Sequence, residues 1–124
     1  MLRKLTILLI VSSGVAVAQT GSGAAGRWRV HSWINGNDQV AECNFMQSGT
    51  TMRGTCTTEQ GQTEITGQSS GSSVSWSYNA DNKGTSSLFS YRGNLGGGKI
   101  IGRIVVSPDP DGATGGAFRA DQIR

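Results

Sequence analysis

The sequence predicts an all-β protein, folded as an eight-stranded antiparallel up-and-down barrel with one disulfide. Short segments rich in Thr, Val, Ile and aromatic residues alternate with turns of Gly, Asn, Asp and Ser at intervals of roughly 8 to 12 residues. No stretch shows the periodicity of a helix. The segment from Cys43 to Cys56 has the pattern of a β-hairpin and carries the chain's only two cysteines. A pattern of an apolar residue, any residue and then a glycine recurs in several of these segments. Glycines at such positions indicate strongly coiled strands.

Residues 1–18 have the features of a secretory signal peptide. Arg3 and Lys4 precede an apolar run from Leu5 to Val11, and the small-residue site Ala16-Val17-Ala18 follows. The apolar run is too short to span a membrane. No cysteine follows the cleavage site, so a lipid-anchored form of the signal is not available. We therefore expect an exported protein, periplasmic or extracellular, with no membrane anchor.

The charge of the chain gives no support to a nucleic-acid-binding protein. The formal net charge is +3, but Arg3 and Lys4 of the signal segment contribute two of the positive charges. Without them the net charge is about +1 at neutral pH. Binding to nucleic acid depends on a surplus of basic side chains, so we expect no such partner.

After the signal segment, residues 19–26 are small and polar and are expected to form a flexible linker. Residues 27–124 are expected to form a single β-barrel domain. Its eight strands are predicted at 27–34, 39–47, 51–58, 62–68, 73–79, 86–94, 99–107 and 115–121.

The register of the hairpin follows from its turn. Gly49-Thr50 forms a two-residue turn with glycine first, and this turn determines which residues pair in the two strands. In that register Cys43 faces Cys56 across a non-hydrogen-bonded pair, at the distance of a disulfide. Phe45 faces Gly54 on the same side. Two cysteines in an exported chain are typical of a disulfide, which for so short a loop contributes about 3 kcal/mol.

Glycines recur inside the predicted strands, each two positions after an apolar residue. The four steps are Met52-x-Gly54, Ile65-x-Gly67, Tyr91-x-Gly93 and Ile100-x-Gly102. Glycine weakens a strand, so its presence there needs a reason. The interior of a small barrel has room for only some large side chains, and a glycine in a strand relieves the crowding, as Gly54 would for Phe45. We expect these glycines to face inward, with the aromatic residues of the fifth and sixth strands.

The spacing of glycines and aromatic residues resembles that of small secreted bacterial barrels of the avidin-like or lipocalin-like kind, a calycin-type family that is largely uncharacterised. The similar positions are Gly26-x-Trp28, Phe45-x-x-x-Gly49-x-x-Met52-x-Gly54, Ile65-x-Gly67, Val74-x-Trp76, Tyr91-x-Gly93, Ile100-x-Gly102 and Gly116-x-Phe118-x-Ala120. The resemblance covers nearly the whole chain after the signal and implies a barrel rather than an activity. No biotin-binding set of residues matches.

The sequence does not assemble a catalytic or metal site, and we expect neither an enzyme nor a cofactor. The single histidine, His31, lies beside Arg29 and Trp33 on the predicted outer face of the first strand, with no nucleophile motif. One imidazole and two oxidised sulfurs do not make a zinc site. The run Asp109-Pro110-Asp111-Gly112 has the pattern of a turn, because Ala120 occupies the place of the glutamate that closes a calcium loop.

An up-and-down strand order brings alternate links to the same end of the barrel. One end then carries the longer links, near 35–38, 59–62, 80–84 and 107–115. Their acidic residues are Asp38, Glu59, Asp81, Asp109 and Asp111. The links at the opposite end are short and uncharged.

The leading hypothesis is a non-enzymatic binding module that holds a small, partly apolar ligand at the acidic end of the barrel. Its lining would be Trp76, Tyr78, Phe89 and Tyr91, with Trp33 at the rim. The same side chains would also suit an ordinary packed core. The alternative function is a protein-interaction module, such as a periplasmic protease-inhibitor-like barrel, in which residues 19–26 or a loop contact the partner.

Overall fold

The computed structural model describes residues 23–82, 84–109 and 115–124, with only the backbone of Asn82. The predicted fold class is confirmed: the described residues form eight strands and no helix. The strands are β1 (Gly26–Ile34), β2 (Asn37–Ser48), β3 (Thr51–Thr58), β4 (Gly61–Ser70), β5 (Ser73–Asn82), β6 (Thr85–Gly96), β7 (Lys99–Ser107) and β8 (Gly115–Gln122). The predicted signal peptide lies outside the described residues.

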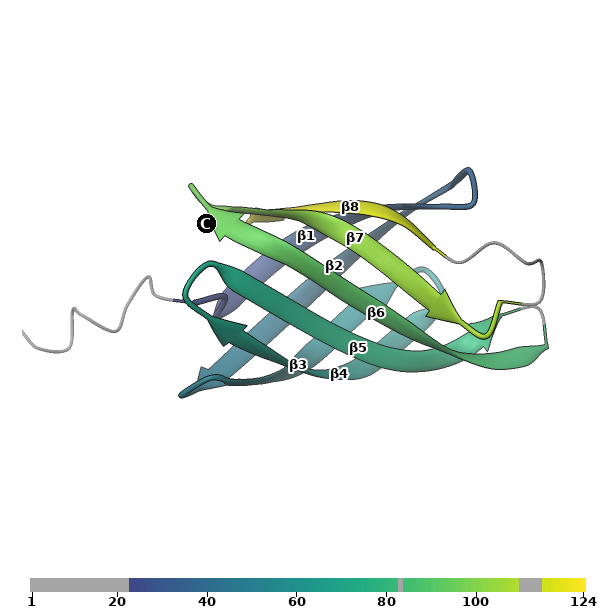
Figure 1. Cartoon of the computed structure of the whole chain (residues 1–124), viewed down its shortest axis with the longest axis horizontal. Helices are drawn as coiled ribbons and strands as arrows, with labels where there is room; N and C mark the ends of the chain where they lie inside the picture. The colour runs from purple at the N-terminus through teal and green to yellow at the C-terminus, as the bar shows by residue number, and fades with distance from the viewer. Residues whose placement is uncertain (1–22, 83, 110–114) are drawn as a thin grey trace, which may run out of the picture.

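The eight strands form one closed barrel (Figure 1). Each strand pairs antiparallel with the next one along the chain, and β8 pairs back with β1. Because consecutive strands run in opposite directions, the links collect alternately at the two ends, as the up-and-down order predicts. Across the residues that the structure describes, no helix is long and apolar enough to cross a membrane.

The register of the hairpin between β2 and β3 is the predicted one. Phe45 pairs with Gly54, and Cys43 pairs with Cys56. The two cysteines form a disulfide with an S–S distance of 2.06 Å and a Cα–Cα distance of 4.0 Å. A structural disulfide indicates a chain that matures in an oxidising compartment.

The glycines within the strands are required by the close approach of the neighbouring backbone. A Cβ atom on Gly54 would lie 2.0 Å from the carbonyl oxygen of Asn44, and one on Gly67 would lie 1.9 Å from that of Ser75. The expected reason, crowding against the ring of Phe45, is therefore secondary. The glycines still have aromatic partners: Phe45 pairs with Gly54, Trp76 with Gly67 and Phe118 with Gly102.

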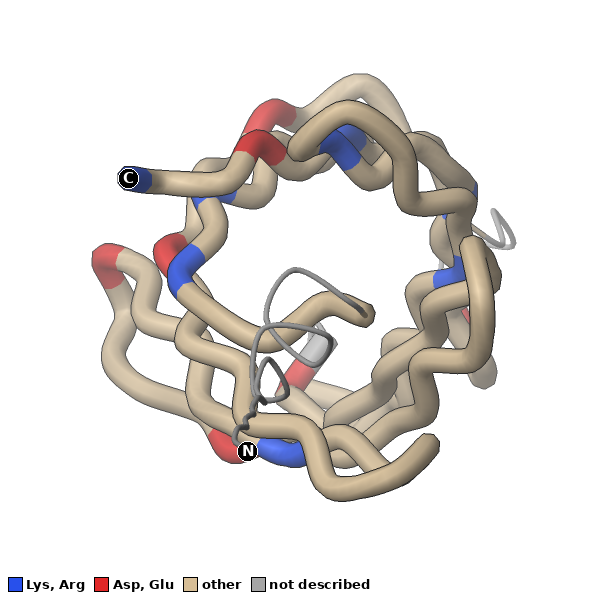
Figure 2. The backbone as a smooth tube through the Cα atoms, turned by 90° about the vertical axis from the view of Figure 1, so that its left-hand side faces the viewer, with Lys and Arg blue, Asp and Glu red and all other residues tan. Residues whose placement is uncertain are grey.

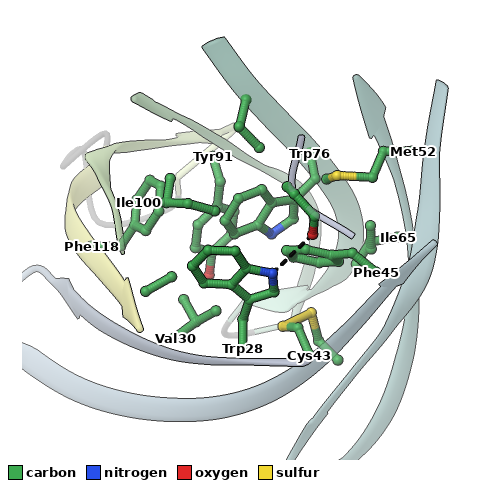
Figure 3. Close-up of a cluster of buried hydrophobic side chains, with 14 of the residues drawn as sticks. Trp28, Val30, Cys43, Phe45, Met52, Ile65, Trp76, Tyr91, Ile100 and Phe118 are labelled. Atoms are coloured by element: carbon green, nitrogen blue, oxygen red, sulfur yellow. Dashed lines mark hydrogen bonds between the residues drawn. A yellow bond between two sulfur atoms is a disulfide. The ribbon is translucent and has the colours of Figure 1, made fainter. Parts of the chain in front are cut away.

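The hydrophobic core fills the half of the barrel near the turns that follow β2, β4 and β6, which we call the closed end. Its largest fully buried side chains converge from opposite walls (Figure 3). They are Trp28, Phe45, Met52, Ile65, Val74, Trp76, Ile100 and Phe118.

The segment before β1 seals the closed end. Figure 2 looks along the barrel from this side, and the chain leading into β1 turns inward across the ring of strands. Ala24 is fully buried, its N–H donates to Gln47 Oε1 at 2.9 Å, and its carbonyl accepts from Trp28 Nε1 at 2.9 Å. Residues 23–26, expected to be part of a flexible linker, are thus packed against the barrel; residues 19–22 lie outside the described residues.

Candidate functional site

The half of the barrel opposite the closed end is hollow. A cavity of about 460 Å³ lies there, lined by the inner faces of β1 to β6 and by the turn that follows β3. We call this end the mouth. The cavity has an aromatic floor, formed by Trp76, Tyr78, Phe89 and Tyr91. It has a wall of amides, hydroxyls and one carboxylate, contributed by Ser32, Gln39, Thr58, Gln60, Gln62, Thr63 and Asp81.

The four floor rings form a continuous stack, which we call the ring ladder. Trp76 stacks on Tyr91 with centroids 5.0 Å apart, and Tyr91 stacks on Tyr78 at 5.9 Å. Tyr78 in turn stacks on Phe89 at 5.3 Å, with ring planes within 7° of parallel. The ladder arises because β5 pairs Trp76 with Tyr91 and Tyr78 with Phe89 on β6, all pointing inward.

Burial along the ring ladder changes from the core to the mouth. Trp76 and Tyr91 are 2% and 4% exposed, whereas Tyr78 and Phe89 are only partly buried. The predicted lining residues are therefore brought together, but they divide into two pairs. The deeper pair belongs to the packed core, and the outer pair faces the cavity.

Two tyrosine hydroxyls meet at the base of the cavity. Tyr78 Oη lies 3.1 Å from Tyr91 Oη, within hydrogen-bonding distance. Burial raises the pKa of Tyr78 above its usual range, and the neighbouring Tyr91 raises it further. Because the phenol form is favoured, Tyr78 remains neutral at physiological pH and does not serve as a base.

Most of the acidic residues expected in the longer links lie around the mouth. Asp81 lines the cavity and accepts a hydrogen bond from the backbone N–H of Gly84 at 3.3 Å. Asp38 and Glu59 line an adjoining hollow of about 570 Å³, which also reaches Phe89. Asp109 belongs to the same end and accepts from Asn35 Nδ2 at 3.1 Å. Asp111 lies outside the described residues.

Trp33 does not line the cavity, contrary to its expected place at the rim. It is 38% exposed on the outer wall and stacks on His31, with centroids 4.5 Å apart. The reason is strand alternation: Ser32, the preceding residue, is the one that points inward. His31 lies on the outer face, as predicted. Within the described residues no group of three His, Cys, Asp or Glu side chains is placed to hold a metal ion.

The polar wall of the cavity was not identified from the sequence, although a signal for it was present. Cys43 and Cys56 point inward, so residues two and four positions away must point inward too. Counting in steps of two leads from Cys43 along β2 to Gln39 and from Cys56 along β3 to Thr58. Both residues line the cavity. Polar residues at inward positions near one end of a barrel indicate that this end is not packed.

A second and larger hollow, of about 910 Å³, lies on the outside of the barrel. It lies over β4 to β8 and is lined in part by short side chains such as Ser75 and Ser90, with Arg92 paired with Arg103 across β6 and β7. A small molecule there would keep more of its surface in water than one in the mouth. The mouth is therefore the better candidate site.

The fold and the cavity together define the class of protein: a closed eight-stranded antiparallel barrel, consistent with a calycin-like fold, with one sealed end and one hollow end. A scan against protein-family models and searches of the curated proteins and of the solved structures found no match.

Proposed function

We propose that this protein is an exported, non-enzymatic binding module that holds a small, partly apolar molecule in the mouth of its barrel. The observation that carries the proposal is the cavity of about 460 Å³ with an aromatic floor and a polar wall. Pockets for small ligands commonly have volumes of about 300 to 1,000 Å³, mostly apolar surface and a few polar groups that orient the ligand. The role is similar to that of the lipocalin-like and avidin-like barrels that the sequence resembles.

The asymmetry between the two ends supports binding at the mouth. Ala24 and the buried rings around Trp28 occupy the closed end, so a ligand would enter from the opposite side. At the mouth, the partly buried faces of Tyr78 and Phe89 offer apolar surface that a ligand would remove from water. Burial of such surface contributes about 25 cal/mol per Å².

The chemistry of the lining favours binding over catalysis. Among the described residues that line the cavity, the ionisable side chains are Asp81, Tyr78 and Tyr91. The raised pKa of Tyr78 makes it a hydrogen-bond donor rather than a base. Asp81 is exposed and holds the backbone of its own turn. No nucleophile stands beside a base within this described lining.

A protein-interaction module is the second candidate, and a separate observation favours it. The outer wall formed by β7, β8, β1 and β2 exposes several large apolar side chains, namely Trp33, Val40, Ile101 and Val105. Apolar side chains gathered on one face are typical of interaction surfaces. The expected contact through residues 19–26 is less suitable, because Ala24 is buried within the barrel.

A thermal-shift screen with a library of small molecules tests the proposal. A molecule that binds only the folded protein stabilises it by about 2.7 kcal/mol at 100 times its Kd. For a domain of this size that corresponds to a rise in Tm of about 10 °C or more. We expect partly apolar molecules to produce such rises in the wild-type protein.

Two variants on the same strand locate the effect. Ala80 lines the cavity, whereas Asn79 is exposed on the outer face. Ala80→Trp should fill the mouth and abolish the shift, while Asn79→Trp should leave it unchanged. Circular dichroism checks that both variants are folded. A screen without stabilising molecules, or equal shifts in both variants, would contradict binding in the mouth.

A further inference from the structure

The outer wall of the barrel carries two arginines side by side at the hollow of about 910 Å³. Arg92 on β6 pairs with Arg103 on β7, and both residues are exposed. They point outward because Tyr91 and Ile104, their neighbours along the two strands, are buried in the core. Residues directly opposite each other on antiparallel strands have Cβ atoms about 5 Å apart, and like charges there destabilise the sheet. A counterion between the two guanidinium groups would remove this cost.

The described residues around the two arginines supply no such counterion. On its other side Arg92 pairs with Ser75, and Arg103 pairs with Ala117. The diagonal positions carry no carboxylate either; they are Ser73, Ser77, Ser90, Asn94, Ile101, Val105, Gly115 and Arg119. The described lining of the hollow contains no aspartate or glutamate.

The other basic residues of the described strands each have an acidic neighbour. These neighbours are Asp121 for Lys99 and Arg119, in ion pairs of 2.7 and 3.2 Å, Glu42 for Arg27, in an ion pair of 3.2 Å, Glu42 again for Arg29, as its pairing partner, and Glu64 for Arg53, at a diagonal position. The unbalanced positive charge of these strands is therefore concentrated at Arg92 and Arg103.

We propose that Arg92 and Arg103 together bind a phosphate monoester on the outer wall. This site lies outside the barrel, apart from the mouth, and does not depend on the proposed function. A phosphate monoester carries about 1.5 to 2 negative charges at neutral pH, which balances the two guanidinium groups. Each guanidinium group presents its N–H donors in a planar fork that matches two phosphate oxygens.

Serine side chains beside the arginines provide further hydrogen-bond donors. Ser75 pairs with Arg92, and Ser77 pairs with Ser90 in the adjacent row. All three serines line the hollow and are partly buried. Their hydroxyl groups have no hydrogen-bond partner among the described residues. Each hydroxyl is therefore able to donate to a phosphate oxygen.

The positive region is narrow, which favours a single phosphate group over a polyanion. Glu64 on β4 lies on one side of the arginines and Asp121 on β8 lies on the other. Both point outward, since Ile65 and Ala120 next to them are buried. A nucleic-acid strand lying across β4 to β8 would bring its phosphates close to these carboxylates, and the like charges would repel.

Titration of the ¹⁵N-labelled protein at low salt and neutral pH tests the inference, with three probes that share one sugar. They are glucose-6-phosphate, glucose-6-sulfate, which carries a single negative charge, and glucose, which carries none. We expect glucose-6-phosphate to shift the side-chain Nε resonances of Arg92 and Arg103 and to bind about fivefold more tightly than glucose-6-sulfate. Glucose should shift neither resonance.

Three variants locate the binding. Arg92→Gln and Arg103→Gln should each weaken the binding of glucose-6-phosphate about tenfold. Arg29→Gln is the matched control, because Arg29 is exposed on β1 and does not line the hollow; it should leave the affinity unchanged. Arg92→Gln should also keep the Tm of the unliganded protein at or above that of the wild type, because it removes a contact between like charges.

Several results would overturn the proposed site. They are the absence of shifts at Arg92 and Arg103 with glucose-6-phosphate, equal shifts with glucose, and equal weakening by Arg29→Gln. A single-stranded oligonucleotide that bound more tightly than glucose-6-phosphate would overturn the monoester and indicate a polyanion. The wild-type titration does not depend on the folding of a variant.

Discussion

Replacing Trp76 by alanine is expected to lower the free energy of unfolding by about 4 kcal/mol, the typical cost of truncating a buried tryptophan. Trp76 is 2% exposed and its ring lies within 4.9 to 5.2 Å of the rings of Phe45, Tyr91 and Phe118. Loss of the indole leaves a cavity where the ring ladder meets the core. Thermal denaturation should show a fall in Tm of more than about 15 °C.

Trp33→Ala is the matched control, because Trp33 is 38% exposed on the outer wall. We expect the control to lower the free energy of unfolding by only about 1 kcal/mol, because it loses little more than the stacking of Trp33 on His31. Trp76→Phe should cost much less than Trp76→Ala, since it keeps a ring and removes the indole Nε1, which is buried without a hydrogen-bond partner among the described residues. If Trp76→Ala and Trp33→Ala were equally stable, Trp76 would not be the centre of the core.

Gly54→Ala is expected to destabilise the barrel by about 3 kcal/mol, although it adds a single methyl group. That methyl would lie 2.0 Å from the carbonyl oxygen of Asn44 in the neighbouring strand, so the backbone of β2 or β3 must move. The valine variant should be affected more strongly. Chemical denaturation of the wild type and the variants measures the difference.

The barrel also offers a control for this substitution. Gly96 lies in β6, has no positive φ, and a Cβ atom there would meet no atom within 4 Å. Gly96→Ala should therefore leave the stability within about 0.5 kcal/mol of the wild type. Equal midpoints for Gly54→Ala and Gly96→Ala would show that the strands are not held together as closely as the structure indicates.

Local patterns were sufficient to predict much of the fold. The turn at Gly49-Thr50 determines the pairing of β2 with β3, and through it the disulfide between Cys43 and Cys56. Strand alternation places Trp76 and Tyr91 inside the barrel. These features could be predicted because each depends on residues that are neighbours in sequence or in one hairpin.

Other features depend on contacts between distant parts of the chain. The burial of Ala24 follows from its hydrogen bonds with Trp28 and Gln47 at the end of the closed barrel, and a small polar segment gives no sign of it. The boundary between the packed and hollow halves depends on how all eight strands are staggered. The sequence therefore indicated that these aromatic side chains point inward but left open which of them face a cavity.

We propose that one half of the barrel binds a ligand, whereas the other half is a packed core. Chemical-shift mapping in a ¹⁵N-labelled sample, titrated with the most stabilising molecule from the thermal screen, tests this division. We expect the amide resonances of Gln39, Thr63 and Phe89 to move, because these residues line the cavity, and those of Trp28 and Ile100 in the closed half to stay in place. Shifts confined to the outer wall around Trp33 and Ile101 would contradict it and would favour the interaction module.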